Sequence, residues 1–282
     1  MTIDTRLHAY RDDLADEGLR GRVEAARFVT PRSAHVTAPT LDLRVAPSPD
    51  AGLMSQALHG DALRVFEERD GWAWVQRACD GYVGYAPADG LREGEGAPSH
   101  IVTAPRTFLY AEPDLKRPMV ATLSMGSHLA VTGTAETRGT AYVETPHGFA
   151  FAGHVAPLGE AGGDWVDWAA GLLGTPYLWG GISALGLDCS GLVTLGLRMV
   201  GRDAPRDSDM QAEGLGEPIA LDEVRRGALV FWRGHVGIME DEETLLHANG
   251  HTMNVARESL AEAVERIGYL YARPTGARLV AL

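Results

Sequence analysis

The chain has 282 residues, a formal net charge of −13 and 45% apolar residues. That apolar fraction excludes a wholly disordered chain, and the excess of acidic residues excludes a phosphate backbone or an anionic membrane as the main partner. We therefore expect a globular protein of two or three domains that binds neither nucleic acid nor a membrane.

Residues 1–32 are rich in charge, and Leu7, Tyr10, Leu14 and Leu19 follow a weak helical period. We predict a short helix followed by an extended arm. The segment has no apolar stretch of the kind found in signal peptides, which predicts a cytoplasmic location.

An internal repeat follows. The Val-Thr-Ala-Pro sequence at 36–39 recurs at 102–105. The same offset relates further pairs: Leu43 and Leu109, Pro47 and Pro113, and Gly60 and Gly126. A repeat of this length indicates two copies of one structural unit.

Each copy contains short runs, such as 62–67 and 72–77, that are rich in Val, Phe and Trp and alternate in polarity. This pattern is typical of half-buried strands and predicts two small all-β barrels, over 33–95 and 96–158. The order of features in each copy resembles bacterial SH3-like domains: Arg or Tyr before Pro, then Gly-Asp or Gly-Ser, then a late Gly-Tyr or Gly-Phe.

Residues 159–282 have a different pattern. Asp164 can cap a helix that begins at Trp165, and residues 189–201 form an apolar segment typical of a buried helix. Four strand-like runs follow, with an amphipathic helix between the last two; we place the strands at 227–232, 235–240, 244–248 and 268–272, and the helix at 258–267. A helix followed by an antiparallel sheet predicts an α+β domain.

Cys189 lies where a loop turns into the buried helix, so the helix dipole and free backbone N–H groups favour a thiolate there. A thiolate nucleophile needs a base nearby. His235 and His247 fall on two successive predicted strands, which can bring a base and its orienting group within hydrogen-bond reach. A cysteine on a helix, a base on one strand and a polar partner on the next is the papain-like arrangement of roles.

Three motifs in this order resemble the NlpC-type cell-wall cysteine peptidases. They are Pro-Tyr-Leu-Trp-Gly-Gly at 176–181, Asp-Cys-Ser-Gly-Leu-Val at 188–193, and His-Val-Gly-Ile at 235–238 with His247 beyond. The resemblance implies a papain-like fold and hydrolysis of the γ-D-glutamyl bond of peptidoglycan stem peptides. It also implies that Cys189 is the nucleophile, His235 the general base and His247 the orienting residue.

The same resemblance assigns further residues. Tyr177 falls near the oxyanion, where the backbone N–H of Cys189 is a second plausible donor. Further residues resemble positions that hold substrate in the family, and the turn at 206–208 resembles one that binds the D-glutamate carboxylate. The substrate-binding residues implied in this way are Asp188, Ser190, Trp179, Arg206, Asp207 and Ser208.

Two SH3-like units ahead of such a peptidase are similar to the dipeptidyl-peptidase VI subgroup. Those enzymes act on free murein tripeptides or tetrapeptides with an exposed N-terminal L-alanine, in cell-wall peptide recycling. In that subgroup the first SH3-like unit closes the cleft, at a position matched by Tyr82, and supplies an acid that meets the substrate amine. Asp50, Asp61 and Glu67 are all candidates for that acid.

Other interpretations remain open. The chain could be a lytic endopeptidase or amidase acting on intact peptidoglycan, or a binding module without catalysis, although the intact Cys-His-His set opposes the latter. Cys189, His235 and His247 could bind zinc, but no fourth ligand has the usual short spacing. Asn249 could replace His247 as the orienting group. We expect Cys79 to be a small core residue, and we expect a monomer without a metal or cofactor.

Overall fold

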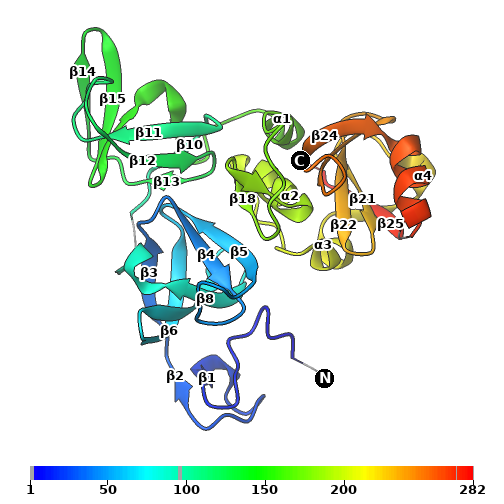
Figure 1. Ribbon diagram of the computed structural model, residues 1–282, viewed down its shortest axis with the longest axis horizontal. Coiled ribbons are helices and arrows are strands. Elements are labelled where there is room, and N and C mark those ends of the chain that lie inside the picture. Colours follow the sequence, from blue (N-terminus) through cyan, green and yellow to red (C-terminus); the bar gives the residue numbers. More distant parts are fainter. Residues whose placement is uncertain (1–2, 95–96, 271, 282) are drawn as a thin grey trace. The chain divides into compact units, whose positions relative to one another are not determined.

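The computed structural model describes residues 3–94, 97–270 and 272–281. The chain divides into two compact units, Met1–Leu158 and Gly159–Leu282, which Figure 1 colours from blue to green and from green to red. The boundary expected between residues 95 and 96 lies outside the described residues. In the described ranges, no helix is both long enough and apolar enough to cross a membrane.

The N-terminal segment contains no α-helix among residues 3–32. Its regular structure is a parallel strand pair around a 3-10 turn: β1 (Ala15–Asp16), η1 (Glu17–Leu19) and β2 (Phe28–Val29). Leu14 is buried against Phe66 and Trp74 of the adjoining sheet, and the Arg11 guanidinium lies 4.4 Å from the centroid of the Trp74 ring. The prediction of a helix is wrong, because this segment is rich in turns and buries Leu14 against the adjoining sheet rather than along one face of a helix. The side chain of Asp16 stabilises such a turn by accepting a hydrogen bond from the backbone of Gly18.

Residues 32–93 form a seven-stranded antiparallel sheet in the order β5-β4-β8-β7-β6-β3-β9. Its strands are β3 (Arg32–Val36), β4 (Thr40–Arg44), β5 (Leu53–Leu58), β6 (Ala62–Arg69), β7 (Trp72–Arg77), β8 (Val83–Pro87) and β9 (Leu91–Glu93), with the turn η2 (Ala88–Gly90) before β9. The strands predicted at 62–67 and 72–77 are confirmed. Alternate side chains such as Leu63, Val65 and Val75 fill the core.

Residues 100–157 repeat this strand order around a separate core. In this second copy the strands form two sheets instead of one, in the orders β12-β11-β16-β15-β14 and β13-β10-β17. Leu43 and Leu109, related by the sequence repeat, are buried in the two cores, and Gly60 and Gly126 share a left-handed φ of 80° and 82°. The elements are β10 (His100–Val102), β11 (Arg106–Tyr110), β12 (Met119–Ser124), β13 (His128–Leu129), β14 (Gly133–Thr137), β15 (Thr140–Thr145), β16 (Gly148–Phe151), η3 (Ala152–His154) and β17 (Val155–Pro157).

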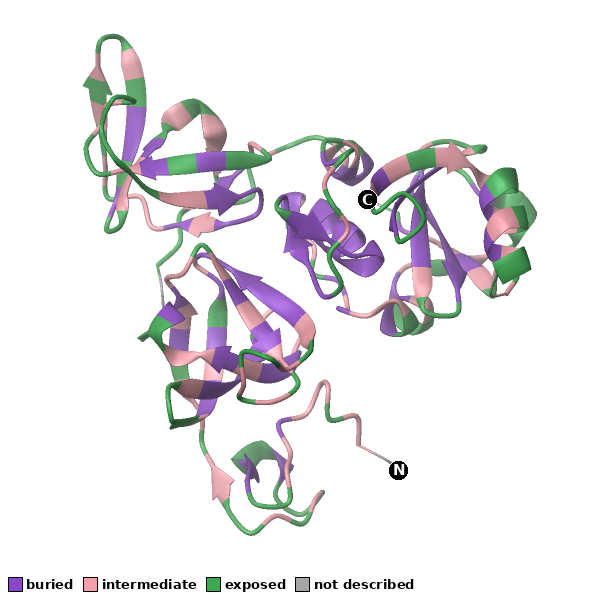
Figure 2. Ribbon diagram, viewed as in Figure 1, coloured by how far each residue is buried: buried purple, intermediate pink, exposed green. Residues whose placement is uncertain are grey.

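The unit Gly159–Leu282 is an α+β domain built on a six-stranded sheet in the order β20-β25-β21-β22-β23-β24. Helix α2 packs against β22 and β23, and α4 packs against β23 and β24. Figure 2 shows α2 and the centre of this sheet as buried. The elements are α1 (Trp165–Ala170), β18 (Ile182–Ser183), β19 (Gly186–Leu187), α2 (Cys189–Met199), α3 (Ser208–Gly214), β20 (Glu217–Ile219), η4 (Leu221–Glu223), β21 (Ala228–Trp232), β22 (His235–Met239), β23 (Thr244–Asn249), β24 (Asn254–Ser259), α4 (Leu260–Leu270) and β25 (Gly276–Leu279).

The structure confirms the helices expected near 165 and 189 and the strands expected at 227–232, 235–240 and 244–248. The strand expected at 268–272 is wrong, because residues 268–270 continue α4; residue 271 lies outside the described residues. A short apolar run is compatible with either element, and here it forms the end of α4, where Tyr269 and Leu270 are exposed. Strands β24 and β25 were not expected, and α4 begins two residues later than predicted.

A Cβ atom at Gly191 in α2 would overlap the carbonyl oxygen of Gly181, whereas one at Gly268 in α4 would meet only a flexible arginine side chain. Alanine is the better helix former by about 0.5–1 kcal/mol. Gly268→Ala should therefore raise the free energy of unfolding, and Gly191→Ala should lower it by about 1–3 kcal/mol because the backbone has to move. Chemical denaturation of both variants measures this difference in sign, and equal effects would contradict the tight packing at Gly191.

Candidate active site

Cys189 is the first residue of α2, and the residue before it caps the helix. The Asp188 carboxylate accepts a 2.7 Å hydrogen bond from the backbone N–H of Gly191. As the first helical residue, Cys189 has a backbone N–H without an intrahelical acceptor, so this group can serve as the second oxyanion donor expected from the sequence. The cap therefore fixes both the thiol and its backbone amide at the start of the helix.

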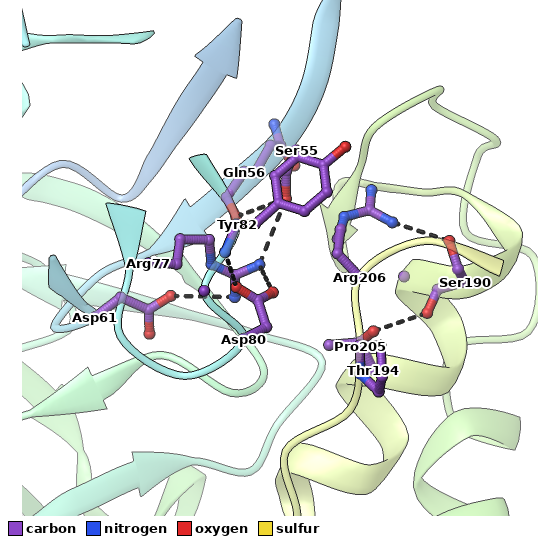
Figure 3. Close-up of polar contacts among 12 residues, drawn as sticks. Ser55, Gln56, Asp61, Arg77, Asp80, Tyr82, Ser190, Thr194, Pro205 and Arg206 are labelled. Carbon is purple, nitrogen blue, oxygen red and sulfur yellow. Dashed lines mark hydrogen bonds and ion pairs between the residues drawn. The ribbon is translucent and has the colours of Figure 1, made fainter. Parts of the chain in front are cut away.

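Asp188 is bound from several sides. It accepts hydrogen bonds from the backbone N–H of Gly180, 3.0 Å away, and from the hydroxyl of Ser190. Arg206 donates through both terminal nitrogens, at 3.0 and 2.6 Å, and also donates to Ser190 Oγ at 2.9 Å. Figure 3 shows the Arg206 guanidinium directed toward Ser190. This network joins the loop before α2, the helix itself and the segment after it.

Asp188, Ser190 and Arg206 bind one another in this network, and their expected contacts with substrate stay predictions. Arg206 is buried, and its charge is balanced by Asp188. Asp207 and Ser208 lie at the start of α3 and are partly exposed. Their expected contacts with substrate stay predictions.

His235 and His247 contact each other directly. Nε2 of His235 lies 2.9 Å from Nδ1 of His247, so the orienting contact expected between the two strands is present. Nε2 of His247 in turn lies 2.8 Å from Oε1 of Glu258 on β24. Asn249, the alternative orienting group, uses its side-chain oxygen to accept hydrogen bonds from the turn at His251 and Thr252.

Burial opposes ionisation of the Cys189 thiol and protonation of the His235 imidazole. Burial, together with the smaller effect of the negative charge of Asp188, raises the pKa of the Cys189 thiol to about 12. A contact with the backbone of Val236, next to His235, acts in the opposite direction but is weaker. Burial and the neighbouring His247 lower the pKa of His235 to about 3. The helix dipole, which we expected to favour a thiolate at Cys189, is opposed by loss of solvation at a side chain only 7% exposed.

Tyr177 lies near the start of α2, in a bridge with Leu187. Burial raises its pKa above the usual range, and the nearby Cys189 and Asp188 contribute to the rise. The hydroxyl therefore stays protonated at neutral pH and is able to donate a hydrogen bond to an oxyanion.

A cavity of about 460 Å³ lies beside the base. Trp179, which is 70% exposed, forms part of its wall together with Trp232, Arg233 and His235. Among the described residues that line it there is no Asp or Glu, and Arg266 adds a further guanidinium. Trp179 is thus a wall residue rather than a core residue.

Tyr82 belongs to the first unit, where Figure 3 shows it beside Ser55, Gln56 and Arg77. Its backbone N–H donates to the carboxylate of Asp80, which is also paired with Arg77 at 2.8 Å. The expected role of Tyr82 in substrate binding stays a prediction.

The three acids proposed for the substrate amine differ in environment. Asp61 is buried and accepts a hydrogen bond from the backbone of Leu58, Glu67 is paired with Arg11 at 2.7 Å, and Asp50 is exposed. Asp61 and Glu67 thus already have partners within their own unit.

Two further outcomes concern the alternatives. Cys79 is half-buried and contacts Arg77, so the expectation of a small core residue is wrong. In the part of the chain that the structure describes, no group of three or more His, Cys, Asp or Glu side chains is arranged to hold a metal ion.

Sequence reasoning missed Glu258 and Arg266. Glu258 was assigned to a helix, although the Asn249-Gly250 pair is a hairpin signal that predicts a strand after it. Arg266 on α4 donates to the Glu258 carboxylate through Nε, 3.3 Å away, and through Nη2.

Comparison with known proteins identifies two domains. The NlpC/P60 family model matches residues 174–270, and the model for the bacterial dipeptidyl-peptidase SH3 domain matches residues 43–91. Dipeptidyl-peptidase 6 of Lysinibacillus sphaericus is 25% identical, over 85% of this chain and 100% of the relative. The γ-D-glutamyl-L-lysine dipeptidyl-peptidase of Bacillus subtilis is 27% identical, over 80% of this chain and 82% of the relative.

The chain is an NlpC-type cysteine peptidase with an SH3 domain. A crystal structure of an NlpC/P60 family protein from Bacillus cereus has a similar fold, with a TM-score of 0.73 at 21% identity, and the match covers 87% of this chain and 98% of that one. In this NlpC-type peptidase a buried thiol, an imidazole held by a second imidazole, and donors at the start of α2 lie in one unit. Such a set can perform nucleophilic acyl transfer.

The buried histidines make the peptidase sensitive to acid. His247 is 1% exposed, and burial together with Arg266 lowers its pKa to about 4, whereas in the unfolded chain a histidine titrates near 6.5. Between pH 6.5 and 4 the unfolded chain therefore binds a proton that the folded chain does not. Each such histidine should reduce the free energy of unfolding by about 1.4 kcal/mol per pH unit as the pH falls.

Denaturation of the wild type and of His247→Gln at pH 7, 6 and 5 measures this effect. The variant should show a slope shallower by about 1.4 kcal/mol per pH unit, because glutamine does not titrate. Parallel pH dependences would show that the pKa of His247 is the same in the folded and the unfolded chain.

Proposed function

We propose that the protein hydrolyses the γ-D-glutamyl–L-diamino acid bond of free murein stem peptides, such as L-Ala-γ-D-Glu-diaminopimelate, in cell-wall peptide recycling. The observation that carries the proposal is the similarity to two dipeptidyl-peptidases over at least 80% of the chain, through both the SH3 domain and the peptidase domain. The B. subtilis relative is named for the γ-D-glutamyl-L-lysine bond, and that chemistry requires a nucleophile and a base of the kind found here.

The proposal extends to architecture. Residues 96–158 are a second SH3-like domain, which is supported by the strand order shared with residues 32–93. The domain 159–282 is papain-like, which is supported by the nucleophile at the start of α2 and the base at the start of β22.

In the reaction, His235 takes the proton of the Cys189 thiol as sulfur attacks the γ-carbonyl carbon of D-glutamate. The oxyanion accepts hydrogen bonds from the backbone N–H of Cys189 and the hydroxyl of Tyr177. The imidazolium gives its proton to the amine of the leaving diamino acid, the C–N bond breaks, and a thioester remains. Water deprotonated by His235 then hydrolyses the thioester, which restores the thiol.

The cavity beside His235 suits the leaving residue. The imidazolium must reach the departing amine, so the diamino acid lies on the side of His235 that this cavity occupies. Arg233 in its wall is exposed, and a guanidinium there favours a leaving residue that carries a carboxylate.

Catalysis by this set predicts a sharp difference between the two cysteines. Cys189→Ala and His235→Ala should each lower the release of L-Ala-γ-D-Glu from the tripeptide by about 10³-fold or more. His247→Ala should retain more activity than either, because an orienting group is less essential than the nucleophile or base. Cys79→Ala is the matched control and should retain wild-type turnover. Chromatography of the released dipeptide measures all four, and full activity of Cys189→Ala would refute the mechanism.

Action on free peptides predicts selection of the N-terminal amine. An acetylated or muramic-acid-linked L-alanine loses the positive charge and leaves buried acceptors unpaired, at a cost of about 1–3 kcal/mol. The value of kcat/KM should therefore fall at least about tenfold, whereas acetylation of the side-chain amine of the diamino acid should have a smaller effect. Tyr82→Phe should weaken the discrimination without abolishing turnover. Equal digestion of free and muramic-acid-linked peptide would instead indicate a lytic endopeptidase.

A further inference from the structure

The His235–His247 pair continues to a third, acidic group. Register places His247 opposite Ala256 on β24, so Glu258, two residues further on, lies on the same face of the sheet. Its long side chain reaches diagonally across the strand pair, and Oε1 lies 2.8 Å from Nε2 of His247. The contact is an N···O approach without hydrogen-bond geometry, and this buried nitrogen has no hydrogen-bond partner among the described residues.

The proton on each ring is constrained by these contacts. A carboxylate oxygen 2.8 Å from Nε2 of His247 would repel a lone pair on that nitrogen, so the proton of neutral His247 lies on Nε2, and its Nδ1 is then an acceptor. Nδ1 of His247 contacts Nε2 of His235, which must therefore carry the proton of His235. The remaining nitrogen of His235, Nδ1, carries no proton and is therefore the nitrogen that can act as a base.

We propose that Glu258 is a positioning residue that holds the proton of His247 on Nε2 and thereby keeps Nδ1 of His235 ready to accept the proton of Cys189. The inference rests on the proposed roles of Cys189 and His235. Without Glu258, His247 can carry its proton on Nδ1 and donate to His235, which would move the proton of His235 to the nitrogen that must act as base.

Arg266 completes the arrangement. It contacts the same carboxylate from α4, so the negative charge of Glu258 is balanced and does not by itself force a proton onto His247. The other charged group that acts on the histidine pair is Asp188, directly before α2. The balance explains how a carboxylate lies 2.8 Å from a histidine that is neutral in the folded protein.

The test uses the full chain with Glu258→Ala and Glu258→Gln. Glutamine keeps an acceptor oxygen and alanine does not, so Glu258→Ala should lower kcat by about 10–100-fold, with Glu258→Gln between it and the wild type. KM should change less than about twofold in both, because Glu258 does not touch the substrate. Glu240→Ala is the matched control: Glu240, directly after β22, is also paired with an arginine, Arg257 of β24. It should leave kcat unchanged.

A spectroscopic measurement separates this role from a merely structural one. In protein labelled with ¹⁵N-histidine, two-bond proton–nitrogen couplings report which ring nitrogen carries the proton. In the wild type and in Glu240→Ala, both His235 and His247 should carry it on Nε2, and in Glu258→Ala a population with the proton on Nδ1 of His247 should appear.

Two outcomes would overturn the inference. One is an unchanged tautomer of both histidines in a folded Glu258→Ala protein. The other is a loss of activity in Glu258→Ala that only follows the fraction of unfolded protein. Both differ from a failure of the proposed function, which would appear as an active Cys189→Ala or a wild type inactive on the tripeptide while its histidine tautomers remain as stated.

Discussion

The active-site unit depends on the buried carboxylate of Asp188. It caps α2 through Gly191, accepts from the loop through Gly180, and forms a two-point ion pair with Arg206. Breaking a buried pair of this kind by removing one partner typically costs about 3–5 kcal/mol, because the remaining charge is left without compensation. The position of Cys189, one residue later, is therefore fixed by an ion pair whose loss would destabilise the fold.

The same carboxylate shapes the chemistry. It lies next to a thiol that is almost fully buried, and both effects oppose ionisation of that thiol. Burial likewise opposes protonation of His235. In the proposed mechanism the proton moves as sulfur attacks, and the contacts from His235 through His247 to Glu258 position the ring nitrogen that accepts it.

The central part of this unit could be predicted from the sequence. The motif around Cys189 and the apolar runs of β21, β22 and β23 have strong local signals, and their order is enough to bring Cys189, His235 and His247 into one domain. The N-terminal segment was not predictable in the same way, since burial of Leu14 against Trp74 uses a sheet that is distant in sequence. Strand β24 is a mostly polar edge strand, so it lacks the alternation that reveals a strand. Glu258 was missed for that reason, and the ion pair of Arg206 with Asp188 was missed because spacing along the chain does not say which charges are buried together.

Identification of the covalent intermediate tests the central claim most directly. During turnover of L-Ala-γ-D-Glu-diaminopimelate, the reaction is quenched with acid, in which a thioester persists, and the protein is digested and analysed by mass spectrometry. The account predicts an L-alanyl-γ-D-glutamyl group on the peptide that contains Cys189 and none on the peptide that contains Cys79. Release of dipeptide with Cys189 unmodified, or a modification located on another residue, would contradict it.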